Sequence, residues 1–453
     1  MQLFFIQLDR HDFFLYNITN YYIQMHYFFI WRHIMEKIIR RDYYLDKIIR
    51  RKQNGLIKVV TGIRRCGKSF LLRTLFRQHL LDEGVDETHI IEMAFDLYSN
   101  KKYRDPAVFE PWAKQQITDE GVYYLLLDEV QLLGEFESVL NEFADMKNVD
   151  VYVTGSNAKF LSKDIITEFG GRSDEIHMYP LSFSEFMSIY NGNKYDGWNE
   201  YITFGGIPLV VLADDEEQKI AILQNLFSET YLQDIKKRYK IKSLEEMNSL
   251  LDFLSSSIGS LTNPNKLVNT FKSVKKSKIT QATVGRYLDH LEDSYLIESA
   301  QRYDIKGKAY LETPLKYYFM DLGLRNVRLN FRQQEPSHSM ENVLYIELRM
   351  RGFSVDVGNV CISERNSDGR PERRQLEVDF VCNKGSKRYY IQSAYRMDSE
   401  EKIKQEQRPL RKIDDGFRKL IITSDSPKPT YNEEGILTMN VYDFLLHPEY
   451  MDY

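Results

Sequence analysis

Short apolar runs alternate with longer amphipathic stretches between residues 57 and 179. The runs at residues 57–61, 89–93, 122–127 and 151–157 are rich in β-branched, aliphatic and aromatic side chains. Such runs are typical of parallel strands that are buried on both faces of a sheet. Because helical stretches separate them, the pattern predicts an α/β domain with a parallel sheet.

A different pattern covers residues 206–325, where helical periodicity dominates. A helix predicted at 279–291 has apolar residues at helical spacing and is followed by two short apolar runs at 295–297 and 308–311. A helix followed by a two-stranded ribbon is the arrangement of a winged helix-turn-helix. We therefore predict a helical and winged-helix segment here.

From residue 340 onward the α/β pattern returns, with a helix at 340–348 and strands at 377–381 and 388–395. A glycine-proline break at residues 205–208 marks the end of the first domain. The regions we predict are an aromatic-rich extension at 1–34, an α/β core at 35–205, the helical and winged-helix segment at 206–325 and a small α/β domain at 326–453.

The first 34 residues differ from the rest in composition, since eleven of them are Phe, Tyr or Trp. Residues 13–31 carry no formal charge, but Asn, Thr, Gln and His side chains interrupt them, and buried polar groups are costly in lipid. We expect no membrane span. Met35 opens a stretch that reads as an ordinary protein start, so we expect residues 1–34 to be an upstream extension; a membrane-binding or partner-binding arm is the alternative.

Residues 62–69 have the sequence GIRRCGKS, a complete G-x-x-x-x-G-K-[ST] motif that follows a predicted strand and precedes a predicted helix. In such a loop, glycines let successive backbone N–H groups point at phosphates. Lys68 is expected to reach the β- and γ-phosphates of ATP, and the Ser69 hydroxyl to bind Mg²⁺. A glycine-rich turn that only caps a helix is the alternative. The residues predicted to contact the nucleotide are Gly62, Ile63, Arg64, Arg65, Cys66, Gly67, Lys68, Ser69 and Phe70.

The uncharged run at 122–127 ends in two acids, Asp128 and Glu129. Ligands of open α/β sheets bind at the carboxyl ends of the strands. Asp128 is therefore expected to hold Mg²⁺, and Glu129 to polarise the water that attacks the γ-phosphate. The alternative is that the two acids cap the following helix.

Three further residues are candidates for roles in hydrolysis. Ser156 and Asn157 follow the strand at 151–157 and are predicted to sense the γ-phosphate, although either side chain could equally cap the next helix. Arg172 is predicted to act as a catalytic arginine on the nucleotide of a neighbouring subunit, or else to face solvent.

These motifs carry a family resemblance. The stretches TGIRRCGKS, YYLLLDEV, YVTGSN and GGRSDEIHMYPLSFSEF resemble those of prokaryotic AAA-like ATPases, and more narrowly the two-part family in which that core precedes a C-terminal domain of unknown function. The resemblance runs from about residue 38 to at least residue 395 and so covers most of the chain. It implies an ATP-binding core with glutamate-assisted hydrolysis, a winged-helix segment and a nuclease-like tail.

Composition limits the partners. The net charge of −5 excludes a protein that is basic throughout, and three cysteines without a C-x-x-C pair exclude a disulfide framework. We expect a reducing, cytoplasmic setting. Lys266, Lys272, Lys275, Lys276 and Lys278 form a local basic stretch without an acid, which favours DNA. Asp289, Glu292 and Asp293 on the predicted recognition helix oppose that reading, so a protein-binding winged helix is equally compatible.

The tail resembles the restriction-endonuclease-like fold, in which a helix acid, a strand aspartate and an E-x-K motif bind metal. Glu341 and Asp379 match the first two, but the E-x-K position reads Gln392-Ser393-Ala394. Neutral glutamine and alanine supply neither a charged ligand nor a lysine. We therefore expect no nuclease activity. Lys402 and Lys404, on the next helix, are the lysines that could replace the missing lysine of the E-x-K motif, and we do not expect them to do so.

Together these features predict an Mg²⁺-dependent ATPase whose conformational switch engages a macromolecule, with DNA favoured through the winged helix and residues 266–278. A protein partner or a homo-oligomer is also compatible. The alternative is a nucleotide-gated, protein-binding adaptor with little or no turnover, which the presence of Glu129 disfavours.

Overall fold

The computed structural model describes residues 38–155, 169, 171–241, 244–275, 279–333, 335–365, 370–426 and 428–452. Its contacts divide the chain into residues 1–40 and 41–453, and the second unit is described below. The extension predicted at residues 1–34 lies outside the described residues.

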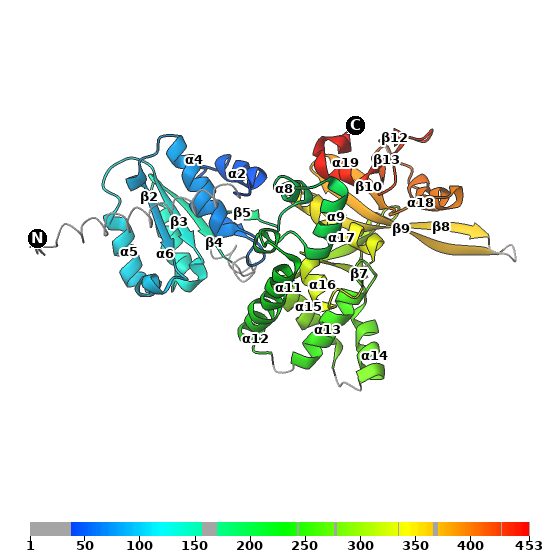
Figure 1. The fold of residues 1–453 in the computed structure, drawn as a ribbon, viewed down its shortest axis with the longest axis horizontal. Coiled ribbons are helices and arrows are strands. Elements are labelled where there is room, and N and C mark those ends of the chain that lie inside the picture. Colours follow the sequence, from blue (N-terminus) through cyan, green and yellow to red (C-terminus); the bar gives the residue numbers. More distant parts are fainter. Residues whose placement is uncertain are drawn as a thin grey trace, which may run out of the picture. The chain divides into compact units, whose positions relative to one another are not determined.

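A parallel sheet of five strands, in the order β2-β3-β4-β1-β5, forms the first part of this unit (Figure 1). Its strands are β1 (Ile57–Thr61), β2 (Ile90–Ala94), β3 (Tyr123–Asp128), β4 (Val149–Thr154) and β5 (Ser173–His177). The predicted parallel sheet is therefore confirmed. Because all five strands run in the same direction, the residues that follow β1 and β3 lie together at the carboxyl ends of the strands, which we call the carboxyl edge of the sheet.

Helices accompany the sheet, and an apolar core fills the space between them. The elements are α2 (Asp42–Ile49), α3 (Lys68–Phe70), η1 (Leu71–Phe76), α4 (Arg77–Asp82), η2 (Glu87–His89), η3 (Tyr98–Arg104), α5 (Pro106–Gln115), η4 (Val130–Leu132) and α6 (Phe136–Ala144). The central strands β1 and β3 are buried along their whole length. This burial explains why both read as uninterrupted apolar runs in the sequence.

Helices dominate the middle of the chain, as predicted. They are α8 (Phe183–Met187), α9 (Lys194–Phe204), α10 (Pro208–Val211), α11 (Glu216–Asn225), η6 (Leu226–Leu232), α12 (Gln233–Tyr239), α13 (Leu244–Ser256), α14 (Pro264–Lys275) and α15 (Gln281–Asp293). The two strands that follow α15 are β6 (Ile297–Asp304) and β7 (Ala309–Phe319), which pair as an antiparallel ribbon.

That ribbon is not an isolated wing, because β6 also pairs with β8. The resulting sheet has eight strands in the order β12-β13-β11-β10-β9-β8-β6-β7. The remaining strands are β8 (Ser354–Arg365), β9 (Pro371–Lys384), β10 (Lys387–Ser393), β11 (Arg418–Thr423), β12 (Thr430–Tyr431) and β13 (Ile436–Asn440). The helices are α16 (Leu322–Arg328), α17 (Pro336–Met350), α18 (Glu400–Arg411), α19 (Val441–Leu446) and η7 (Pro448–Asp452). One sheet thus takes strands from both sides of residue 325.

Among the described residues, no helix combines the length and the apolar character that crossing a membrane requires.

Candidate nucleotide-binding site

The loop after β1 has the backbone shape that a phosphate-binding loop needs. Gly62 has φ of 133°, and a Cβ there would lie 2.0 Å from the backbone oxygen of Met178, so only glycine fits. Gly67 has φ of 102° and directly precedes the helix that starts at Lys68. The loop therefore turns sharply at both glycines and leads into a helix N-terminus, where anions are favoured.

The side chain of Lys68 folds back into the phosphate-binding loop. Its ammonium donates hydrogen bonds to the backbone oxygens of Gly62, at 2.9 Å, and of Ile63, at 3.0 Å, and the residue is only 5% exposed. The positive charge is thus held where phosphates are expected to bind. A lysine ammonium has three donors, so one N–H of Lys68 is left over beyond the bonds to these two carbonyls.

Ser69 and Asp128 meet at the carboxyl edge of the sheet, as the predicted magnesium site requires. The Ser69 hydroxyl donates to Asp128 Oδ1 at 2.9 Å, and the Thr154 hydroxyl, at the end of β4, donates to the same oxygen. Burial raises the pKa of Asp128 above its ordinary value. A hydroxyl and a single carboxylate fit Mg²⁺, which binds few protein oxygens and keeps water and phosphate ligands. The described residues contain no cluster of three or more His, Cys, Asp or Glu side chains suited to a metal.

Glu129 follows Asp128 in a left-handed backbone conformation with φ of 54°. Its backbone N–H donates to the Thr154 hydroxyl at 3.0 Å, and its carboxylate accepts a hydrogen bond from the Gln131 side chain. The Glu129 side chain makes no capping hydrogen bond to the short helix η4. The helix-capping alternative is therefore wrong for Glu129, and Thr154, which sequence reasoning missed, contacts both acidic residues.

Arg41, which lies outside the G-x-x-x-x-G-K-[ST] motif, binds the phosphate-binding loop through hydrogen bonds. Its guanidinium donates to the backbone oxygen of Cys66 at 2.9 Å and of Tyr179 at 2.8 Å, and it pairs with Glu185 at 2.9 Å. Arg41 is 2% exposed. One buried side chain thus connects the middle of the loop with the turn that follows β5.

The helical segment also reaches the loop. Tyr231, in η6, donates its hydroxyl to the backbone oxygen of Arg64 at 2.8 Å and is nearly fully buried. The Arg64 guanidinium lies 3.9 Å from the Asp234 carboxylate. The loop is therefore in contact with residues more than 160 positions away in the sequence.

The other predicted site residues lie elsewhere. Arg172 immediately precedes β5, beside the start of β1, and its half-exposed side chain pairs with Asp145 at 2.7 Å. It therefore lies at the edge of the sheet opposite the phosphate-binding loop of the same chain. Its role toward a neighbouring subunit stays a prediction. Ser156 and Asn157 lie outside the described residues.

The tail brings the two predicted acids together, and a lysine lies between them. Lys316, in β7, contacts Glu341 at 2.8 Å, Glu377 at 2.7 Å and Asp379 at 3.6 Å, and only 3% of it is exposed. Burial raises the pKa of Asp379, while the pKa of Lys316 is held high by the surrounding carboxylates. The lysine at the acids thus comes from β7 and not from α18, where Lys402 pairs with Glu406.

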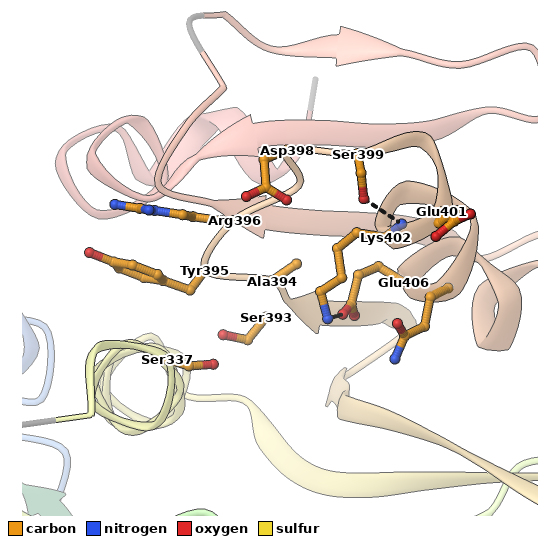
Figure 2. A pocket seen from close by; sticks show the side chains of 11 residues that line it. Ser337, Ser393, Ala394, Tyr395, Arg396, Asp398, Ser399, Glu401, Lys402 and Glu406 are labelled. Atoms are coloured by element: carbon orange, nitrogen blue, oxygen red, sulfur yellow. Dashed lines mark hydrogen bonds and ion pairs between the residues drawn. The ribbon is translucent and has the colours of Figure 1, made fainter.

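Gln392 and Ala394, at the former E-x-K positions, do not join this cluster. Gln392 donates to Glu406 of α18 at 3.1 Å, and Ala394 packs in an apolar cluster with Leu410. A pocket of about 430 Å³ opens beside them, between the end of β10 and α18 (Figure 2). Its lining mixes basic and acidic side chains, including Arg396, Lys402 and Glu401, so its charge favours no single class of ligand.

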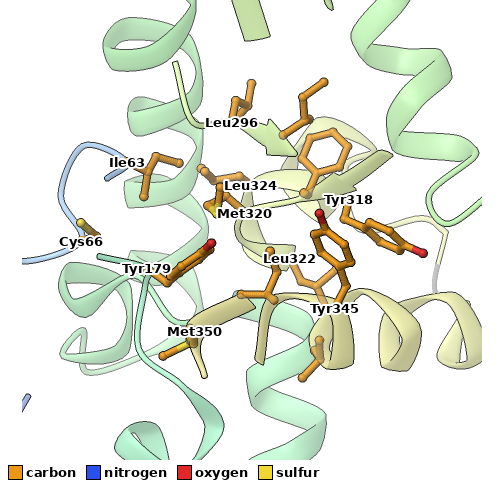
Figure 3. Close-up of a cluster of buried hydrophobic side chains, with 14 of the residues drawn as sticks. Ile63, Cys66, Tyr179, Leu296, Tyr318, Met320, Leu322, Leu324, Tyr345 and Met350 are labelled. Atoms are coloured by element: carbon orange, nitrogen blue, oxygen red, sulfur yellow. The ribbon is translucent and has the colours of Figure 1, made fainter. Parts of the chain in front are cut away.

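An apolar cluster extends from the phosphate-binding loop to the eight-stranded sheet (Figure 3). Ile63 and Cys66 of the loop belong to the same cluster as Tyr318 of β7 and Tyr345 of α17. The Cys66 side chain is fully buried there. It therefore contributes to packing and does not face an open phosphate site.

The basic stretch predicted to bind DNA is described only in part. Lys266 is exposed on α14, whereas the side chains of the other four lysines lie outside the described ones. On α15, Arg286 bonds only weakly to Thr283, at 3.4 Å.

Comparison with known proteins gives the class first. Residues 54–187 match a family model described as "AAA domain", and residues 195–335 match "Domain of unknown function (DUF8612)". With the five-stranded parallel sheet and its phosphate-binding loop, the first part is a P-loop NTPase core of the AAA type, followed by helical and α/β segments.

The family follows from a relative in Haemophilus influenzae, described as "Uncharacterized protein". It is 33% identical over 415 residues, which cover 90% of this chain and 99% of the relative. The chain belongs to the same family as this protein. "Uncharacterized protein MJ1544" of Methanocaldococcus jannaschii is 27% identical over 428 residues, 90% of this chain and 88% of that protein. Among solved structures, the Aeropyrum pernix ORC2 protein matches with a TM-score of 0.35 and 9% identity, over 65% of this chain and 95% of that one.

Proposed function

We propose that the chain is an Mg²⁺-dependent ATPase whose nucleotide state controls the engagement of DNA. The observation that carries the ATPase part is the contact between the Ser69 hydroxyl and the Asp128 carboxylate, next to Glu129, at the carboxyl edge of a P-loop sheet. These are the oxygen ligands and the general base that ATP hydrolysis needs.

Each residue has a role in the proposed mechanism. The loop N–H groups and Lys68 bind the phosphates, Ser69 and Asp128 hold the metal, and Glu129 orients the attacking water. When bound, Mg²⁺ supplies positive charge that favours the charge on the transferring phosphoryl group. The hydrogen bond that the Glu129 N–H donates to the Thr154 hydroxyl supports the role of Glu129, because it fixes the backbone from which the Glu129 carboxylate extends.

The switch is supported by the contacts that surround the loop. Arg41 ties the loop to the turn after β5, and Tyr231 ties it to the helical segment. A loop that rearranges around phosphates changes both contacts, and through them the segment that holds the predicted winged helix. DNA is the proposed partner because of the lysines at 266–278.

Steady-state ATP hydrolysis with and without duplex DNA, at two salt concentrations, tests the proposal. We expect turnover that DNA stimulates, that salt suppresses and that Glu129→Gln lowers by about 100-fold or more without loss of ATP binding. Turnover indifferent to DNA contradicts the DNA part. If the wild type binds ATP but hydrolyses it no faster than Glu129→Gln, the adaptor function replaces the ATPase.

A further inference from the structure

The hairpin of β8 and β9 extends beyond the rest of its sheet. Strand β6 pairs with β8 only at residues 357–359, and β10 pairs with β9 only at residues 380–384. Among the described residues, 360–365 and 371–376 therefore pair only with each other. Figure 1 shows these two strands reaching away from the other strands of the sheet. They form a two-stranded ribbon with two faces.

One face of this ribbon is partly covered by α18. The register places Ile362 opposite Arg374 and Glu364 opposite Glu372, which puts these four side chains on the same face. Ile362 belongs to an apolar cluster with Leu410 of α18, and Glu364 accepts hydrogen bonds from Arg408 of the same helix. Helix α18 therefore covers Ile362 and Glu364 on this face, whereas Glu372 and Arg374 stay exposed and form an ion pair with each other at 3.2 Å.

The other face is open and basic. We call it the ribbon face, and it consists of Cys361, Ser363, Arg365, Pro371, Arg373 and Gln375, all exposed. It contains no acidic side chain. Arg365 and Arg373 are diagonal neighbours, because Arg365 pairs with Pro371, two residues from Arg373. Neither guanidinium group makes a hydrogen bond or an ion pair with another described residue.

Further basic groups border the ribbon face where it meets the sheet. Arg302, in β6, donates to Gln375 at 3.1 Å and to Asn359 at 3.3 Å, and its Nε has no partner among the described residues. Lys306 and Lys308 are exposed on the turn that follows β6. Since Asp304 of β6 pairs with Asn359 of β8, this turn lies beside the base of the ribbon.

We propose that the ribbon face binds the phosphate backbone of duplex DNA; this rests on the proposed function, in which DNA is the macromolecule engaged. A two-stranded β-ribbon fits the major groove, and arginine suits phosphate because its guanidinium offers several donors. The ribbon face has no large apolar side chain. Protein interfaces depend on such buried anchors, so the face suits a nucleic acid better than a protein.

Cys361 provides a test on the unaltered chain, because it is exposed on the ribbon face while Cys66 and Cys382 are buried. The probe is iodoacetamide, with the extent of alkylation at each cysteine read by peptide mass spectrometry. A 30-base-pair duplex at about 50 mM salt should slow alkylation of Cys361 several-fold, and about 500 mM salt should abolish that protection because phosphate contacts are screened. Equal alkylation rates with and without a duplex that is shown to be bound overturn the proposal.

Arg373 and Arg374 form a matched pair of variants, since they are adjacent and lie on opposite faces of the ribbon. We expect Arg373→Gln to weaken duplex binding about eightfold at 0.1 M salt and to lower the salt slope by about 0.9, the contribution of one phosphate contact. Arg374→Gln removes the same charge from the opposite face, where Arg374 already pairs with Glu372, and should bind like the wild type. Equal effects of the two variants, or no effect of either, overturn the proposal.

Basal ATP hydrolysis, measured in parallel, separates this proposal from the proposed function. Both variants should hydrolyse ATP like the wild type, since neither arginine lies at the phosphate-binding loop. If the wild type binds DNA and Arg373→Gln binds it equally well, the ribbon face is excluded while DNA engagement stands. If the wild type hydrolyses ATP but binds no duplex at low salt, DNA engagement and the ribbon face both fail, and an acidic protein becomes the partner to test.

Discussion

Tyr231 donates its hydroxyl to the backbone oxygen of Arg64 at 2.8 Å, so the helical segment touches the middle of the phosphate-binding loop. In the same structure Lys68 is bonded to the carbonyls of Gly62 and Ile63. The Tyr231 contact therefore belongs to a loop conformation in which the lysine is engaged internally. Because this bond joins the helical segment to the backbone of the loop, we expect a rearrangement of the loop to alter it.

Tyr231→Phe removes that hydrogen bond and keeps the buried ring. We expect ATP to bind about two- to fivefold more tightly, because the variant no longer holds the loop in the internally bonded form, a difference of about 1 kcal/mol or less. Isothermal titration calorimetry with a non-hydrolysable ATP analogue measures this. Weaker binding would mean that the bond also supports the nucleotide-bound loop.

Thr154→Val keeps the shape of the side chain and removes the hydroxyl that bonds to Asp128 and to the Glu129 N–H. We expect kcat to fall about tenfold or more, since the metal ligand and the base lose a shared support, with the Kd for ATP changed less. Thr154→Ser retains the hydroxyl and is the matched control, with kcat near that of the wild type. Equal kcat for the valine and serine variants would show that the hydroxyl positions neither acid.

Lys316→Met leaves Glu341, Glu377 and Asp379 close together without their central cation. Because repulsion between buried carboxylates is then uncompensated, we expect the free energy of unfolding to fall by about 3–5 kcal/mol at pH 7.5. The loss should shrink as the pH is lowered and the carboxylates become protonated. Lys402→Met is the control, since the Lys402 side chain is 38% exposed and its pair with Glu406 lies nearer the surface; its loss should be about 1 kcal/mol or less. Urea denaturation of both variants decides the comparison.

Asp321 should make stability depend on pH below neutrality. Burial raises the pKa of its carboxyl to about 6, although the carboxyl accepts hydrogen bonds from the N–H groups of Gly206 and Leu324. The folded state therefore binds the proton more tightly than the unfolded state, whose pKa is near the ordinary value of about 4. The resulting stabilisation is complete below about pH 4 and is lost as the pH rises to about 6.

Asp321→Asn removes this titration. We compare the free energy of unfolding of the wild type with that of the variant. The wild-type value minus the variant value should decrease by on the order of 2–3 kcal/mol as the pH rises from 4 to 7. Urea unfolding of both proteins at several pH values measures the difference. A difference independent of pH would mean that the carboxyl keeps its ordinary pKa on folding.

The sequence predicted those parts of the molecule whose signals are local. The strands around the loop appear as continuous apolar runs because they are buried on both faces, and the loop motif is contiguous. The meeting of Ser69 with Asp128 also followed, since parallel strands bring their carboxyl ends to one edge. In the tail the sequence predicted a helix and two strands, and Glu341 and Asp379 lie in one cluster, joined by Lys316.

Residues that act across long sequence separations could not be predicted in this way. Arg41, Tyr231 and Lys316 carry no motif, and each acts through partners on elements far along the chain, so only the tertiary fold brings them to their sites. The Cys66 side chain points into the apolar cluster because of the backbone conformation of a tight turn, which the loop motif does not specify. Thr154 lies within two or three positions of Ser156 and Asn157 in the sequence, and no motif distinguishes its hydroxyl from their polar side chains.

The eight-stranded sheet also limits how such a protein can be rearranged during evolution. Strands β6 and β7 precede residue 325, yet they form one edge region of a sheet whose other strands all follow that residue. A gene fusion that joined the ATPase core to a new tail at this point would remove the pairing between β6 and β8, so that β6 would keep only β7 and β8 only β9. The strands from Ile297 to Asn440 are therefore expected to be inherited as one block, with exchange of modules confined to the chain before α15.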